Sequence, residues 1–249
     1  MKNVLIYVSP NKKFNAEDNT LVKIQIDNSL DLGWKKSDIL LLTDFPFSYN
    51  GVTSHVLTKD TYYPFDLNAS KIPALLELFT DGSIKKNEIY WCHDLDAYEN
   101  FRITESELGL HNVDVGFTHY FYKPEWMGSS FFFKKSAQDI FELLDTTIKK
   151  RRYRGRNNEK NLTWLMDNHM IDPLRVKKMN VTYNIMKRCL RTIYVQANKP
   201  LKVLHFRPSN YDTLMPDTAL NMFMYGKNSL HKPLMDDRLI HIFHHHGLK

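Results

Sequence analysis

Two aspartates, Asp94 and Asp96, follow an apolar segment that runs from Glu88 to His93. If this segment is a strand, its alternation points both carboxylates to the same side, within reach of one ion. A hard divalent cation such as Mg²⁺ or Mn²⁺ binds oxygen ligands and often keeps positions for substrate phosphates. The Asp-x-Asp pattern therefore predicts a site for a metal ion and a diphosphate. The alternative is that the two aspartates simply begin a loop.

The neighbours of this pair have simpler interpretations. His93 alternates to the opposite face, so we expect a packed structural role, and Cys92 is expected to be a small buried hydrophobe. The histidines at 241 and 244–246 suggest a metal site, but three consecutive residues cannot all face one ion, so we favour a surface role. The basic run 149–156 is interpreted as a solvated helix end. A loop over a diphosphate, or a surface for nucleic acid or anionic lipid, stays open for it.

Length and composition restrict the class of protein. The chain has 249 residues, 43% of them hydrophobic, which allows one large domain with a sizeable core. Two cysteines offer no disulfide framework, so we expect reduced thiols and a cytoplasmic protein that is not secreted. The apolar run at the N-terminus is too short for a signal peptide, and no segment approaches the roughly 18 apolar residues of a membrane span. The net charge of +6 suits phosphate groups or a polyanionic partner.

The first hundred residues alternate between buried strands and helices. Residues 22–26 could be a strand, but we favour a helix over 15–32, because parallel neighbours need a crossover element. The expected elements are a strand at 4–8, this helix ending at Gly33, a strand at 38–43, a helix from a Ser70 cap to Gly82, and a strand reaching Cys92. This βαβαβ pattern predicts an α/β fold. Ser9, Asp44 and the aspartate pair then lie at the carboxyl ends of strands, where such sheets bind ligands.

The remaining chain is expected to complete the domain. We expect strands at 113–118 and 129–133, a helix opened by a capping box at Ser136 and Asp139, a helix at 161–170, and a strand at 201–206. From Pro216 onward no core pattern is evident. We therefore expect a domain over 1–215 and a short C-terminal appendage over 216–249, packed on the core or trailing from it.

Four segments in this order resemble the glycosyltransferases of the GT-A fold, and the likeness is greatest to the small virus-encoded enzymes of the chlorovirus type. They are the first strand with its Ser9-Pro10 loop, Ser70–Leu76, Tyr90–Asp96, and Trp126–Lys135. The resemblance covers roughly residues 3–210. It implies a Rossmann-like, mixed but mainly parallel central sheet flanked by helices, and a location in the host cytoplasm if the protein is viral.

The resemblance also implies ligands and site residues. It implies a nucleotide-diphosphate sugar donor, UDP-sugar being favoured, a glycan or glycoprotein acceptor, transfer of a hexosyl or deoxyhexosyl group, and Mn²⁺ or Mg²⁺. Asp96 would be the main metal ligand, and Asp94 would touch the metal or the donor ribose. His205 matches the histidine that often completes the metal site, and its imidazole suits Mn²⁺ better than Mg²⁺. Lys71 would place a charge near the phosphates, with Ser9 and Asp44 near the nucleotide base and ribose.

The catalytic base is expected to be a carboxylate. Glu159 resembles the acidic residue that begins a helix under the acceptor site, where an inverting enzyme would deprotonate the acceptor hydroxyl. A glutamate in the first turn of a helix also simply complements the helix dipole. Asp114 and Asp167 are rival bases. Because no clean acidic pair occurs at this position, inverting and retaining outcomes both stay open.

Two other functions compete with glycosyl transfer. A sugar-nucleotide nucleotidyltransferase would usually carry a glycine-rich, basic loop after the first strand, but Ser9–Lys13 contains lysines and no glycine. A non-enzymatic nucleic-acid-binding protein would rest on the basic run and the net charge, with binding that weakens steeply in salt. We favour the glycosyltransferase, and do not expect a nucleic-acid partner.

Overall fold

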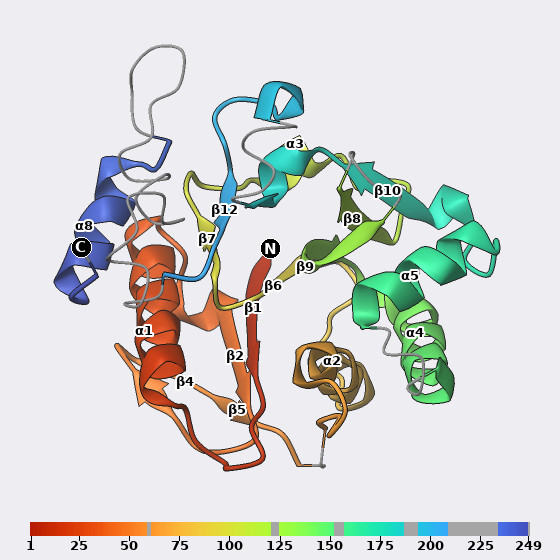
Figure 1. The fold of residues 1–249 in the computed structure, drawn as a ribbon, viewed down its shortest axis with the longest axis horizontal. Helices are drawn as coiled ribbons and strands as arrows, with labels where there is room; N and C mark the ends of the chain where they lie inside the picture. The colour runs from red at the N-terminus through yellow and green to blue at the C-terminus, as the bar shows by residue number, and fades with distance from the viewer. Residues whose placement is uncertain (59–60, 121–124, 152–156, 187–193, 209–233, 249) are drawn as a thin grey trace.

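The computed structural model describes residues 1–58, 61–120, 125–151, 157–186, 194–208 and 234–248. A seven-stranded sheet crosses the molecule in the order β10-β8-β9-β6-β1-β2-β5, with helices on both faces (Figure 1). Its strands are β1 (Lys2–Tyr7), β2 (Ile39–Thr43), β5 (His55–Val56), β6 (Tyr90–His93), β8 (Val115–His119), β9 (Trp126–Phe133) and β10 (Val176–Met179). Only β9 runs antiparallel to its neighbours β6 and β8, so the sheet is mixed and mainly parallel, as predicted.

A second, smaller sheet and a hairpin complete the β-structure. The small sheet has the order β11-β12-β7, formed by β11 (Ile185–Met186), β12 (Val203–His205) and β7 (Ala97–Glu99). The hairpin pairs β3 (Ser48–Tyr49) with β4 (Val52–Thr53). The described helices are α1 (Ala16–Asp31), α2 (Lys71–Thr80), α3 (Glu105–Leu108), α4 (Gln138–Arg151), α5 (Asn158–Asp167) and α8 (Asp237–His245). None of them is long and apolar enough to cross a membrane.

Strand alternation divides the core between the two faces of the large sheet. Leu5, Trp91 and Phe132 join the cluster that contains the apolar side chains of α1, α8 and the small sheet. Their neighbours Val4 and Cys92 join the other cluster, which contains those of α2, α4 and α5. Because both faces are covered, the central strands read as continuous apolar runs, which is typical of buried parallel strands.

The expected strands and helices are confirmed, with shifts of a few residues at their ends. The parallel pairing of β1 with β2 and β6 makes the predicted βαβαβ unit, and residues 15–32 are helical. Gly33 and Gly82 adopt positive φ just beyond α1 and α2, which explains why these helices end there.

Two predicted helix caps are wrong. Ser70 has helical backbone angles, because a 3₁₀ turn at Leu67–Ser70 runs directly into α2, and its hydroxyl accepts a bond from the Tyr63 amide at 2.8 Å. Ser136 and Asp139 form no capping box. Ser136 donates instead to Asp114, while Asp139 accepts from Arg175. The local sequence suggested caps, but all three side chains bond partners outside their own helix.

The sequence analysis did not predict α8. Leu239 and Phe243 of this helix are fully buried against the core cluster that includes α1. Arg238 donates to Asn28 Oδ1 at 2.6 Å, and His246 lies 2.8 Å from Asp27, so α8 lies along α1 (Figure 1). The C-terminal segment of the described chain therefore packs on the same layer as the first helix.

Candidate active site

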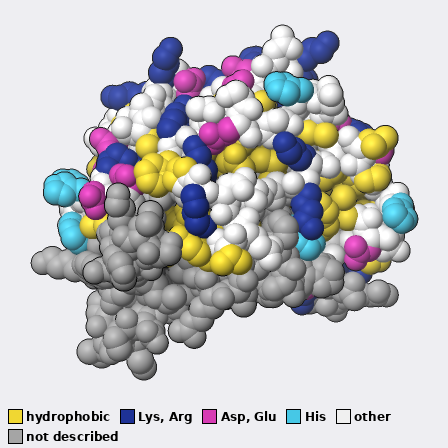
Figure 2. Space-filling view, turned by 90° about the horizontal axis from the view of Figure 1, so that it is seen from above, with side chains coloured by type: hydrophobic (Ala, Val, Ile, Leu, Met, Phe, Trp, Pro, Cys, Tyr) yellow, Lys and Arg dark blue, Asp and Glu magenta, His cyan; other side chains and the backbone are white. Residues whose placement is uncertain are grey.

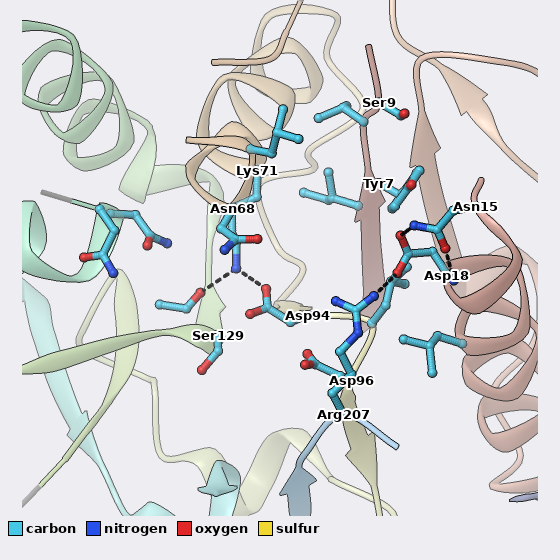
Figure 3. Close-up of a pocket in the computed structure, with 18 of the residues that line it drawn as sticks. Tyr7, Ser9, Asn15, Asp18, Asn68, Lys71, Asp94, Asp96, Ser129 and Arg207 are labelled. Carbon is cyan, nitrogen blue, oxygen red and sulfur yellow. Dashed lines mark hydrogen bonds and ion pairs between the residues drawn. The ribbon is translucent and has the colours of Figure 1, made fainter. Parts of the chain in front are cut away.

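A cavity of about 780 Å³ opens at the carboxyl ends of β1 and β6. Its walls come from the loop after β1, the N-termini of α1, α2 and α5, the start of β9 and the residues at the end of β12. The lining residues labelled in Figure 3 include Lys71, Asp94, Asp96, Ser129 and Arg207. This is the edge of the sheet where the sequence analysis expected a ligand site.

A tight turn after β6 places the two aspartates in this cavity. The Asp94 amide donates to Ser129 O at 2.9 Å, and the Ala97 amide donates to Asp94 O at 3.0 Å, so the chain turns directly into β7. Asp94 and Asp96 both line the cavity. His93 points away from it, stacks on Trp91 with ring centres 3.9 Å apart, and bonds Asn3 Oδ1 at 2.8 Å. Its buried position agrees with the structural role expected from alternation.

His205 joins the aspartates through the small sheet. β12 pairs antiparallel with β7, and His205 is the partner of Ala97, so its ring lies beside Asp96. One donor atom each from Asp94, Asp96 and His205 lies within 4.8 Å of the others, and no other such group of three occurs in the residues that the structure describes. Two carboxylates and one imidazole suit a divalent ion such as Mn²⁺. The residues present therefore fit the metal that the sequence predicted.

A buried asparagine orients the histidine. Asn184 is fully buried, and its Oδ1 lies 3.0 Å from His205 Nδ1. The Asn184 amide nitrogen donates to Ser129 Oγ at 2.7 Å and to Met127 Sδ at 3.1 Å. Because a thioether sulfur can only accept, these contacts assign Oδ1 as the acceptor for the ring. Nδ1 of His205 therefore carries the hydrogen in this network, and Nε2 faces Asp96 at 3.3 Å. This arrangement is typical of a metal-ligating histidine and its outer partner.

The charges of the cluster shift one another's titration. Burial alone would raise the pKa of Asp96, but the charge and hydrogen bond of His205 lower this pKa to about 2. Burial lowers the pKa of His205, and Asp96 and Asp94 more than offset this effect, so the net shift is upward. Burial raises the pKa of Asp94, with Lys71 opposing that shift. The cluster therefore places two carboxylates beside one partly buried imidazole. A bound cation would stabilise the negative charge of these carboxylates.

Lys71 bridges Asp94 and β9. Its ammonium bonds Asp94 and donates to Gly128 O at 3.1 Å (Figure 3). Burial lowers the pKa of Lys71, but Asp94 more than compensates and the net direction is up, so the lysine stays charged. Only 10% of its side chain is exposed. A fixed positive charge therefore lies within the cavity, beside the candidate metal ligands.

Glu159 lies at the cavity wall beside Gly128, in the first turn of α5. Asn157 caps this helix by accepting a bond from the Lys160 amide at 3.0 Å. Glu159 accepts from the Gly128 amide at 3.2 Å and from the hydroxyl of buried Tyr120 at 3.1 Å. Both donors neutralise part of its charge and hold the carboxylate at the cavity wall.

The remaining predicted binding residues lie near the first strand. Ser9 lines the cavity, and its amide donates to Asp44 Oδ1 at 3.1 Å. Asp44 is mostly buried behind it, and its second oxygen lies 3.1 Å from Lys12 Nζ. Asp44 thus supports the loop after β1 and does not itself line the cavity.

The two rival bases lie outside the cavity. Asp114 is held by Arg175 Nε at 2.5 Å and by Ser136, at the end of the sheet near β10. Asp167 is exposed at the C-terminal end of α5.

The basic run 149–156 begins in the last turn of α4, which ends at Arg151, and residues 152–156 lie outside the described residues. On the face in Figure 2, basic side chains are separated by apolar and polar surface and form no continuous stripe.

Some cavity residues were missed by the sequence analysis. Arg207 lines the cavity and binds the N-terminus of α1 through Glu17 at 2.6 Å and Asp18 at 2.9 Å. A signal for it existed, because Arg207 follows His205 by two residues, as side chains on one face of an extended chain do. For Asn184, in a loop before β11, the sequence contains no comparable signal.

No family model and no curated protein sequence matches this chain, but solved structures do. A structure of the galactosyltransferase LgtC with donor and acceptor sugar analogues has a TM-score of 0.56 at 12% identity, over 86% of this chain and 91% of that one. A glycosyltransferase involved in glycosylation of the major capsid of PBCV-1 has a TM-score of 0.55 at 10% identity, over 82% and 93%. GlyE of Streptococcus pneumoniae has a TM-score of 0.54 at 13% identity, over 84% of this chain and 56% of that one.

These similarities concern the fold. The neighbours are GT-A glycosyltransferases, and the chain has the same mixed α/β architecture over more than four-fifths of its length. The fold class predicted from the sequence is therefore confirmed.

Proposed function

We propose that this protein is a metal-dependent glycosyltransferase, which moves a sugar from a nucleotide-diphosphate donor to a hydroxyl group of a glycan or glycoprotein. The observation that carries the proposal is the cluster of Asp94, Asp96 and His205 in the cavity of a GT-A fold. The names of the structural neighbours support it, since all three are glycosyltransferases and one was solved with donor and acceptor analogues.

The metal would be held by Asp94, Asp96 and His205, with Mn²⁺ favoured over Mg²⁺ because of the imidazole. When bound, such an ion supplies Lewis-acid stabilisation of the negative charge on a departing diphosphate. Lys71 and Arg207 add two cationic side chains to the same cavity. Both can attract a donor phosphate, and Arg207 can do so in a bidentate manner.

The donor nucleoside would lie at the end of β1. Ser9 lines this part of the cavity, and Asp44 holds the Ser9 amide in place. We propose that Ser9 contacts the base or ribose, with Asp44 supporting this contact from behind, and that the base is uracil.

The acceptor would approach from the α5 side. Transfer replaces the diphosphate at the anomeric carbon with the acceptor oxygen, whose proton must leave. Glu159 lies at the cavity wall with two hydrogen-bond donors on its carboxylate, and we propose that it orients the acceptor hydroxyl and takes its proton. We propose as well that the catalytic domain spans 1–215 and that the protein acts in the cytoplasm.

The test is a thermal-shift panel of UDP-, GDP-, dTDP- and CMP-sugars, each with and without Mn²⁺. We expect one nucleotide class, UDP, to raise the unfolding midpoint only when the metal is present, because a ligand that binds only the folded state stabilises it. The Asp96→Ala variant is the control, and should keep its circular dichroism spectrum while losing the shift. A folded protein that binds no donor at millimolar concentration with metal would refute the proposal.

A further inference from the structure

Histidine and aspartate side chains, which are residue types that can bind metals, line a second cleft between α1 and α8. His241 and His245 are four residues apart on α8 and therefore share one face of the helix. Asp27 and Asp31 have the same spacing at the end of α1. All four residues, with Asp237, line one surface cleft between the two helices, which lie side by side in Figure 1.

Contacts on both sides of this cleft hold the helices together. His246 lies 2.8 Å from Asp27 Oδ2, and Asp27 also accepts from Tyr49 and Asn50. Arg238 donates to Asn28 Oδ1 at 2.6 Å and to Asn100 O at 3.1 Å. The backbones that carry the histidines and the aspartates are therefore fixed relative to each other, which reduces the entropy lost when a ligand bridges them.

Several side chains that line the cleft are free to bind a ligand. His241, His245 and Asp237 are exposed and make no hydrogen bond or ion pair with the part of the chain that the structure describes. The side chain of Asp31 is 53% exposed, and its carboxylate makes only a 3.6 Å contact with Arg238. Arg238 is also held by its bonds to Asn28 and Asn100, so its position does not depend on Asp31. Their donor atoms are not gathered as tightly as those around Asp96, but exposed side chains change rotamer at little cost.

The charge of the region favours a cation. The carboxylates of Asp27, Asp31 and Asp237 line this cleft together with Arg238, and Asp27 also lies 2.8 Å from His246. α1 has no basic residue in its last turn, so Asp31 lies unfavourably at the negative end of the helix dipole. The histidines belong to the second half of α8, whose C-terminal end also attracts positive charge. A divalent ion bound by Asp31 would place positive charge at this end of α1, where the helix dipole favours it.

We propose that His241 and His245, with the carboxylate of Asp31, form a second metal site that clips α8 to α1. Two imidazoles four residues apart on a helix, completed by a carboxylate, are a ligand set for Zn²⁺. The site is structural: it fastens the C-terminal helix to the first helix of the core. It does not depend on the proposed function, and it uses only two of the four clustered histidines.

His244 provides a matched control. It lies in the same helix and is equally exposed, but it does not line the cleft. The protein, made without a polyhistidine tag, would carry Asp94→Ala and Asp96→Ala to remove the first site. Zn²⁺ affinity and stoichiometry are then measured by competition with a chromogenic chelator. Into this background His241→Gln, His245→Ala, Asp31→Asn and His244→Ala are introduced one at a time, and circular dichroism checks each fold.

We expect the background protein to bind one equivalent of Zn²⁺. His241→Gln or His245→Ala should weaken binding at least tenfold, Asp31→Asn should weaken it severalfold, and His244→Ala should change it less than twofold. Zn²⁺ should also slow amide hydrogen exchange in α8, unless His245 is replaced. No stoichiometric binding by the background protein, or equal losses from His244→Ala and His245→Ala, would overturn the proposal, since equal losses indicate a diffuse histidine-rich surface. If the double aspartate variant unfolds, the same series is run in the His205→Ala background.

Discussion

Replacing Asn184 with alanine tests whether the buried network behind His205 sets the metal affinity. The amide oxygen of Asn184 is 3.0 Å from His205 Nδ1, and its amide nitrogen donates 2.7 Å to Ser129 Oγ. Without it, the imidazole can rotate or present a protonated nitrogen to Asp96. Loss of such an outer partner typically weakens metal binding about 10- to 100-fold. This range corresponds to about 1.4–2.7 kcal/mol of binding free energy.

The same change also costs stability, and a control must separate the two effects. Asn184 is fully buried, so its loss leaves buried polar partners unsatisfied, at a cost of about 1–3 kcal/mol. Asn100 is equally buried and bonds Leu201 O at 3.1 Å and Leu234 O at 3.0 Å, with no contact to the metal cluster. Asn100→Ala should therefore lower the free energy of unfolding by a similar amount and leave Mn²⁺ affinity unchanged.

The assay is isothermal titration of Mn²⁺ into both variants and into His205→Ala, with urea unfolding run in parallel. Asn184→Ala should fall between the unmodified protein and His205→Ala in metal affinity. If Asn184→Ala binds Mn²⁺ as tightly as the unmodified protein while His205→Ala does not, the imidazole is a ligand that needs no orienting partner, and the reasoning fails. If His205→Ala is also unchanged, His205 is no ligand.

Three further predictions follow from packing and charge. A Cβ on Gly128 would lie 2.6 Å from Asn158 Nδ2 and 3.7 Å from Glu159 Cγ, so Gly128→Ala should displace the Asn158 side chain beside Glu159 and reduce the proposed glycosyl transfer severalfold; lower steady-state rates with unchanged Mn²⁺ titration would confirm this, and unchanged rates would contradict it. Burial raises the pKa of Cys92 to about 12, so iodoacetamide should modify this thiol only in denaturant, as peptide mass spectrometry would show; labelling of the native protein at Cys92 would contradict its burial. Hydrogen bonds from Arg175 lower the pKa of Asp139, so their stabilisation is complete above the unfolded pKa of about 3.9 and is lost as pH falls through the lower folded value. Arg175→Met should therefore lower the thermal midpoint at pH 7, and its difference from the parent should shrink as the pH falls below about 3.9. A difference that does not shrink at low pH would show that packing, not charge, is responsible.

The sequence predicted the positions of those site residues that directly follow the end of a strand. The segment from Glu88 to His93 is apolar and short, so its end could be located, and Asp94 and Asp96 followed from that end. His205 was reached through the resemblance to a family, and the antiparallel pairing of β12 with β7 then brings it beside Asp96. The gathering of these three side chains was thus predictable, and their roles remain predictions.

The parts that the sequence did not predict depend on contacts between distant segments. Asn184 acts through Ser129 and His205, and nothing in its own neighbourhood distinguishes it from a loop asparagine. The helix cap predicted at Ser70 is wrong for the same reason, and Asp114, a candidate base, lies outside the cavity. Ser70 turned to Tyr63 rather than to its own helix, and Asp114 was captured by Arg175 from another element. Local propensity is too weak to decide such choices against a buried partner.

The pairing of β7 with β12 has a consequence for how the protein is made. It joins Ala97 to His205, which is the largest sequence separation among the described strand pairs. Because loop-closure entropy grows with separation, we expect this pairing to form after the more local pairing of β1 with β2. On the ribosome, the chain carries both aspartates long before it carries the histidine. A nascent chain that ends before residue 205 cannot complete the cluster, so tight metal binding would report a chain synthesised at least to the end of β12.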